Sequence, residues 1–182
     1  MAGDPQILWR RLDVPGHEAC RLLHEGDFPG LSGVAVWADP KGPAHLSYLV
    51  TCDAGWITRS VRVQGRVGAD ELSLSIHRHD SGEWRLNGEA LAEFHGLQDI
   101  DLGFSPATNT LPIRRLRQQG ADTADLAAVW LDPSDGKLKR LPQRYRRTGG
   151  SWHYSSVGFD AELTVDADGF VTDYPGLWIK ED

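Results

Sequence analysis

The sequence predicts a mainly β fold, an antiparallel meander of short strands with one short helix packed against the sheet. Three observations support this prediction. Short apolar runs alternate with turn residues along most of the chain, glycine and proline occupy 30 of the 182 positions (20 Gly and 10 Pro), and a single segment has the boundaries of a helix. Hydrophobic residues make up 40% of the chain and seven residues are tryptophan, which is enough for a substantial core.

The strands are predicted from alternating apolar and polar residues between turn signals. They cover residues 7–12, 46–50, 56–63, 72–78, 83–86, 159–165 and 170–172. Asn87-Gly88 is the strongest hairpin signal, because both residues tolerate the positive φ angles of a tight turn. Strands and helices do not alternate regularly, so parallel β–α–β units are not expected.

The helix is predicted at about residues 110–119. Asn109 or Thr110 can cap its first turn, Pro112 fits within that turn, and Gly120 is suited to end it. Few positions in the segment are apolar, and three arginines lie beside them. Because so short a helix is stable only when it packs against other structure, we expect it to lie on the sheet.

Two segments of the chain resemble each other at an offset of 93 residues, counted from position 34 to position 127. Val34–Pro40 is similar to Ala127–Pro133, and each copy is followed by a strand and then by a turn containing a tryptophan. Duplication of a β-meander explains this similarity, and so does chance, since strands often end in Asp-Pro. No linker-like stretch divides the halves, so we expect one domain over residues 1–182.

The formal net charge is −7, from 19 Lys and Arg against 26 Asp and Glu. This balance argues against nucleic acid as a partner, because phosphate contacts need a dense basic face. One stretch, residues 137–147, contains six basic residues and no acid. Its cations either offset acids on a neighbouring solvated strand or form a site for an anionic headgroup or an acidic partner.

No membrane-spanning segment is expected. The longest apolar run covers residues 34–38, far short of the ~20 residues that cross a bilayer. The first six residues carry neither a basic nor an apolar region of the kind found in signal peptides. A cytoplasmic location is therefore expected.

A pair of carboxylates is the clearest candidate for chemistry. Asp99 and Asp101 lie two residues apart, so on a strand they point the same way. If they are partly buried, their mutual repulsion keeps a proton on one of them to higher pH. Such a pair suits a sugar-hydroxyl acceptor, a divalent-metal site or an acid/base pair, and the alternative is a solvated strand end.

Other chemistry finds little support in the sequence. His77 and His79 share a strand face, but no recognisable third zinc ligand accompanies them, so we predict no metal. No motif for nucleophilic catalysis or for a nucleotide phosphate is present, and we predict no cofactor.

The stretch Asp99–Leu116, with its Thr-Asn-Thr-Leu-Pro-Ile-Arg-Arg core, resembles a bacterial family labelled as glycolipid-binding and similar to DUF1089. Phe159–Leu177 supports the same resemblance, as do shorter matches at residues 16–18, 55–59 and 143–145. The resemblance implies a β-sheet wrapped around the helix, as a roll or open barrel, in a homodimer. It also implies an acidic pocket that holds a glycolipid or a sugar.

The resemblance and the residues together lead to the hypothesis of a binding protein for a glycolipid or sugar-containing small molecule, involved in glycolipid metabolism. Carboxylates would accept sugar hydroxyls, arginines would position the headgroup, and aromatic rings would form flat apolar walls. The expected ligand-binding residues are Glu18, Trp56, Arg59, Asp99, Asp101, Asn109, Arg114 and Tyr145.

Two other functions remain open. The protein could be a carboxylate-based hydrolase or another enzyme acting on glycolipids, which would need two carboxyl groups across an open cleft. It could also be an interaction module whose basic stretch, residues 137–147, meets an acidic partner.

Overall fold

The computed structural model describes residues 4–25 and 28–181, and in these residues 15 strands surround one α-helix and two short 3-10 helices. The first part of the chain contains β1 (Gln6–Arg11), β2 (Gly16–Glu25), β3 (Phe28–Asp39), β4 (Gly42–Cys52), β5 (Thr58–Val67), β6 (Asp70–Arg78), β7 (Trp84–Leu86), β8 (Glu89–Leu91) and η1 (Ala92–Phe94). The second part contains β9 (Asp99–Leu102), η2 (Ala107–Asn109), α1 (Thr110–Gln119), β10 (Thr123–Asp132), β11 (Lys137–Thr148), β12 (Ser151–Ser156), β13 (Phe159–Val165), β14 (Val171–Tyr174) and β15 (Trp178–Glu181).

All of these strands belong to one sheet, in which most strands pair with their neighbours along the chain. One pairing joins strands that are far apart in the sequence: β1 pairs with β15 and so connects the two parts of the chain. The pairs are antiparallel except for β9 and β10, which run parallel to each other. The expectation of no parallel β–α–β unit is therefore wrong here, because α1 carries the chain from β9 to β10 in the same direction.

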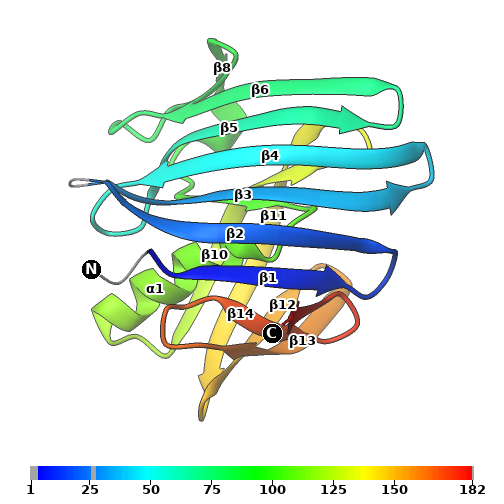
Figure 1. The fold of residues 1–182 in the computed structure, drawn as a ribbon. Helices are drawn as coiled ribbons and strands as arrows, with labels where there is room; N and C mark the ends of the chain where they lie inside the picture. Colours follow the sequence, from blue (N-terminus) through cyan, green and yellow to red (C-terminus); the bar gives the residue numbers. More distant parts are fainter. Residues whose placement is uncertain (1–3, 26–27, 182) are drawn as a thin grey trace.

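The sheet curves into a roll around α1. Figure 1 shows β1–β6 in front, β10 and β11 crossing behind them, and the helix between these parts. The curvature brings β9 to the start of β5, where the Thr58 amide donates to the Gln98 carbonyl at 3.0 Å and the Thr58 hydroxyl accepts from the Ile100 amide at 3.2 Å. The two edge strands, β8 and β9, do not pair with each other, so the roll is not closed. The predicted mainly β roll around one helix is confirmed.

Local predictions hold where turn chemistry decides the conformation. Asn87 and Gly88 both have positive φ, 49° and 91°, in the turn between β7 and β8. Trp56, by contrast, is not a strand residue as predicted: it has a φ of 62° in the turn before β5. The two similar segments each run along a strand, β3 or β10, into the turn of a long hairpin. Duplication stays a hypothesis.

Helix α1 has the predicted boundaries. It ends at Gly120, which has a φ of 63° and donates its amide to the Arg117 carbonyl. Leu111, Ile113 and Leu116 are buried and fill the interior of the roll. Asn109 precedes the helix, but its side chain makes no capping bond, because that side chain is used elsewhere.

A buried ion pair ties α1 to the sheet. The Arg115 guanidinium donates two hydrogen bonds to the Asp99 carboxylate, at 2.8 and 2.6 Å, and both side chains are at most 5% exposed. Arg115 also donates to the Trp56 carbonyl at 3.2 Å. Since two charges that far from water are tolerated only when they are paired, this contact fixes the helix against β9.

The basic stretch, residues 137–147, lies along β11 beside acidic residues of β10 and its turn. Lys139 binds Asp132 at 2.7 Å and Asp135 at 2.9 Å. Two further pairs link the same region, Arg144 to Asp125 and Arg147 to Asp122, at 3.5 and 3.7 Å. These contacts favour the interpretation in which the cations offset acids on a neighbouring strand.

We predict that Arg115→Met destabilises the protein by about 3–5 kcal/mol, because the Asp99 carboxylate is then buried without a partner. The matched control is Arg59→Ala, which removes the exposed ion pair with Asp80 and should change stability by less than about 1 kcal/mol. Urea unfolding measures both. The double variant Arg115→Met/Asp99→Leu should recover much of the loss, and equal effects of the two single variants would contradict the buried-pair account.

Candidate functional site

A cavity of about 390 Å³ opens between η2 and the second half of the sheet, strands β9 to β15. It is lined by one carboxylate, several hydroxyl and amide groups, and a set of aromatic and aliphatic side chains. The lining residues are Asp101, Leu102, Gly103, Ser105, Asn109, Trp130, Leu141, Tyr154, Ser156, Val157, Phe159, Tyr174, Leu177 and Trp178. This volume lies near the lower end of the ~300–1,000 Å³ typical of small-molecule sites.

Asp101 is the acidic residue of this cavity. The Gln143 amide nitrogen donates to its Oδ2 and also to the Tyr154 hydroxyl at 3.1 Å. The other oxygen, Oδ1, has no hydrogen-bond partner within residues 4–25 and 28–181. Burial, together with the neighbouring Asp99 charge, raises the pKa of Asp101 to about 6. The carboxyl group thus has one oxygen held in place and one available to a ligand.

Aromatic rings form one wall of the cavity. The Tyr154 ring lies 6.1 Å from Tyr174 and 6.3 Å from Phe159 between ring centroids, and Phe159 lies 5.8 Å from Tyr174. On another wall, the Trp130 ring packs against Gly103, where an added Cβ would lie only 2.5 Å from the indole nitrogen. Gly103 therefore allows the Trp130 ring to occupy its position in the lining.

Glu18 lies behind the lining and reaches it through Ser105. Its Oε1 accepts hydrogen bonds from the Tyr48 hydroxyl at 2.5 Å and the Ser105 hydroxyl at 2.6 Å, while its Oε2 has no partner in the described residues. Tyr48 crosses β3 at Gly33, where an added Cβ would lie 2.3 Å from the Tyr48 hydroxyl. Complete burial raises the pKa of Glu18 to about 8, although both hydrogen bonds oppose this shift. At neutral pH the group is mainly protonated.

The sequence-predicted residues divide into those near the cavity and those elsewhere. Asp101 and Asn109 line it, and the Tyr145 hydroxyl donates to the Asn109 side-chain oxygen at 2.7 Å. Tyr145 is buried and holds Asn109 from behind. Glu18 completes this group through Ser105.

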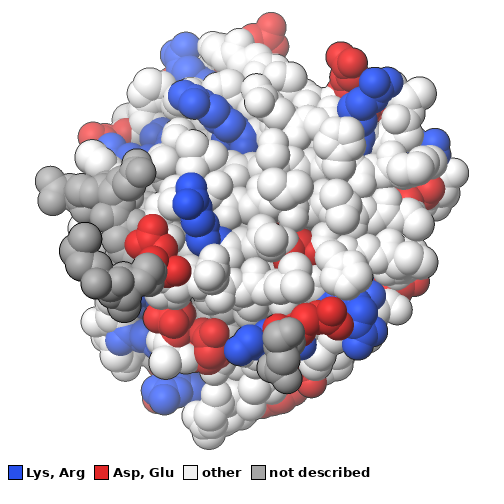
Figure 2. Space-filling view, in the orientation of Figure 1, with Lys and Arg blue, Asp and Glu red and all other residues white. Residues whose placement is uncertain are grey.

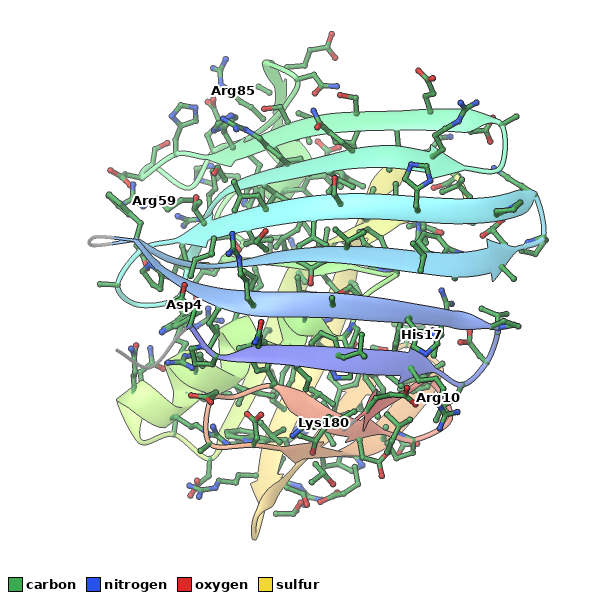
Figure 3. All side chains as sticks on the ribbon, viewed as in Figure 1. Asp4, Arg10, His17, Arg59, Arg85 and Lys180 are labelled. Atoms are coloured by element: carbon green, nitrogen blue, oxygen red, sulfur yellow. The ribbon has the colours of Figure 1, made fainter. Side chains whose placement is uncertain are left out.

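The other four predicted residues belong neither to the cavity lining nor to the hydrogen-bonded groups behind it. Asp99 is bound to Arg115. The Arg114 guanidinium lies over the Trp56 ring at 4.4 Å and donates to the Asp168 carbonyl. Arg59 pairs with Asp80 on the outside of the sheet, where Figure 3 labels it near the end of the front strands.

Several lining residues were not identified from the sequence. Tyr154, Phe159, Tyr174 and Trp178 come from four consecutive strands, and nothing in their local patterns separates a cavity-lining ring from a core ring. Ser105, Phe159 and Tyr174 lie within the two stretches that resemble the glycolipid-binding family, and this resemblance was the available signal for them.

A second hollow, of about 560 Å³, lies over β1, β2 and β3. Figure 2 shows the outer face of these strands, whose centre is largely uncharged. The hollow is lined by Gln6, Ile7, Leu8, Ala19, Cys20, Arg21, Ser32, Gly33 and Val34. It is open, and its described lining residues include no carboxylate and no aromatic ring, so the interior cavity is the better candidate for a sugar.

Two general observations complete the description. Within residues 4–25 and 28–181, no three or more His, Cys, Asp or Glu side chains are grouped so that they could hold a metal ion. None of the helices described is long and apolar enough to span a membrane.

Comparison with known proteins agrees with this architecture. A family model described as "Putative glycolipid-binding" matches residues 6–180. A crystal structure of a DUF1089 family protein from Pseudomonas aeruginosa is similar to the fold with a TM-score of 0.73 and 33% sequence identity, covering 88% of this chain and 90% of that one. No curated protein matches the chain.

We predict that Glu18→Gln removes a pH dependence of stability. Because the raised pKa of Glu18 means that the folded protein binds this proton more tightly than the unfolded chain does, wild-type stability should fall as pH rises toward 8. The slope from one proton is about 1.4 kcal/mol per pH unit. Glutamine keeps the oxygen that accepts from Tyr48 and Ser105 and carries no titratable proton. Urea unfolding from pH 6 to 8 tests this, and parallel profiles for the two proteins would refute it.

Proposed function

The chain belongs to the putative glycolipid-binding family, and from that premise we propose that its interior cavity binds the carbohydrate headgroup of a glycolipid. The observation that carries the proposal is the position of the Asp101 carboxylate among aromatic rings in one cavity. Rings such as Tyr174 and Trp178 pack on the apolar C–H faces of a sugar, while a carboxylate oxygen accepts hydrogen bonds from its hydroxyls. The two kinds of contact match the apolar faces and the hydroxyl-bearing edge of a pyranose ring.

The size of the cavity limits what it can enclose. A volume of about 390 Å³ accommodates a headgroup of about one or two sugar rings but not the acyl chains of a whole lipid. Apolar side chains lie at the edge of the site: Val157 is 79% exposed, and Leu177 lines the cavity beside Leu12, which is 42% exposed. We assign the start of the hydrocarbon chain to this apolar rim.

The residues behind the lining have a supporting role in this proposal. Glu18 fixes the Ser105 hydroxyl, and Tyr145 fixes the Asn109 amide, so both polar groups are oriented before a ligand arrives. Such preorganisation reduces the entropy lost on binding. Trp56, Arg59, Asp99 and Arg114 receive no ligand contact in this proposal.

Binding is favoured over hydrolysis by the number of available carboxyl groups. A carboxylate-based hydrolase needs two of them facing the substrate. Among the described residues that line the cavity, Asp101 is the acidic one, and its strand neighbour Asp99 is occupied by Arg115. The hydrolase hypothesis predicts release of nitrophenol from nitrophenyl glycosides, whereas binding without turnover supports the present proposal.

A homodimer and a cytoplasmic location remain predictions from the sequence and its resemblance. Sedimentation velocity of the purified protein tests the first, and fractionation of cells expressing it tests the second.

We predict that the protein binds octyl glucoside below its micellar concentration, and that Asp101→Asn weakens this binding about tenfold, because the sugar's hydrogen bond to this side chain loses the carboxylate charge. Asp80→Asn, a matched change on the outer surface, should leave the affinity unchanged. Isothermal titration calorimetry measures all three proteins. Equal weakening by both substitutions, or an affinity that Asp101→Asn leaves unchanged, would contradict the proposed site.

A further inference from the structure

The charge of the cavity restricts the ligand more narrowly than its shape does. Among the described lining residues there is no Lys, Arg or His, and Asp101 is the acidic side chain. Anionic groups such as phosphate, sulfate and carboxylate are bound in proteins by cationic side chains or by clusters of backbone amides. This cavity therefore lacks the side chains that an anionic headgroup requires.

Cations close behind the lining are already neutralised. Arg11 lies 5.4 Å from the centroid of the Trp178 ring, but its guanidinium makes two hydrogen bonds to Asp13. Lys139 lies 5.4 Å from the Trp130 ring, and it binds two carboxylates of the β10–β11 turn. Both charges are therefore balanced by acids next to them, and neither supplies excess positive charge to the cavity.

The hydrogen-bonding groups of the cavity also bear on the class of headgroup. The Ser105 hydroxyl donates a hydrogen bond to Glu18, and its oxygen accepts one from the Ala107 amide at 3.0 Å, so toward the cavity it can act only as an acceptor. Oδ1 of Asp101 is a second acceptor, without a partner in the described residues. The Tyr154 hydroxyl accepts from Gln143 and keeps its own proton for donation. The two acceptors suit groups that donate strongly, which are hydroxyl and ammonium groups, and the Tyr154 hydroxyl can donate to a sugar oxygen beside them.

From these contacts we propose that the cavity selects headgroups by charge: an amino sugar binds most tightly, a neutral sugar less tightly, and an anionic sugar most weakly. This inference rests on the proposed function and adds the class of headgroup to it. An ammonium group beside Asp101 gains a charge-assisted hydrogen bond. A uronate or phosphate in the same position meets a like charge and loses its hydration without compensation.

The test compares three octyl glycosides with the same ring and chain but different charge: octyl glucosaminide, octyl glucoside and octyl glucuronide. Affinities are measured at pH 7 by calorimetry, below the micellar concentration of each. We expect the glucosaminide to bind roughly tenfold or more tightly than the glucuronide, with the glucoside between them. In Asp101→Asn the glucosaminide and the glucoside should bind about equally, whereas Asp80→Asn should keep the wild-type order.

The preference should also depend on pH. The ionisable groups around Asp101 are Asp99 on its own strand, which is bound to Arg115 of α1, and Tyr145, Tyr154 and Tyr174 from β11, β12 and β14. Burial raises the pKa of each of these tyrosines, so they stay neutral near pH 7. Asp101 becomes protonated as pH falls through about 6, and the preference for the glucosaminide over the glucoside should be smaller at pH 5.

The outcomes separate this inference from the proposed function. Equal or tighter binding of the glucuronide overturns the charge selection but leaves sugar binding in place. A glucosaminide preference that persists in Asp101→Asn overturns the role of Asp101. If none of the three glycosides binds, the proposed function itself fails, and the inference fails with it.

Discussion

A single sheet that curves into a roll leaves space inside it, and the way in which that space is filled determines where a cavity remains. Helix α1 fills one part with Leu111, Ile113 and Leu116. The Arg115–Asp99 ion pair fixes the helix against β9. The space beyond η2 is left unfilled, and the candidate site lies there. The cavity is therefore a consequence of how one short helix is held inside one long sheet.

The strand that anchors the helix also supplies the candidate site. Asp99 and Asp101 lie on the same face of β9, but their environments give them different roles. Asp99 is neutralised by a guanidinium, whereas Asp101 is held by the neutral amide of Gln143 and keeps one oxygen for the cavity. The protonated Glu18 adds a third acidic group without adding negative charge at neutral pH. The site is thus less acidic than its composition indicates.

The sequence was sufficient to predict those elements whose conformation depends on a few neighbouring residues. Pro112 fits the first turn of α1, Gly120 ends the helix, and Asn87-Gly88 forms a hairpin turn, because each depends on backbone preferences of a few residues. The resemblance supplied the roll, and the spacing of Asp99 and Asp101 identified the strand that borders the cavity.

Sequence patterns failed where curvature brings distant strands together. The contact of Glu18 with Tyr48 depends on Gly33 in the strand between them, and no local pattern reveals it. Arg114 and Arg115 look equivalent in the sequence, yet a turn of 100° per residue along a helix sends one to Trp56 and Asp168 and the other to Asp99.

The most direct test of the account is a crystal structure of the protein with octyl glucoside. The account predicts a sugar ring in the interior cavity, with a hydroxyl within hydrogen-bond distance of Asp101 Oδ1 and the octyl chain leaving past Leu177. A glycoside bound only in the open hollow beside Leu8 and Val34, with the interior cavity filled by rearranged side chains, would contradict it.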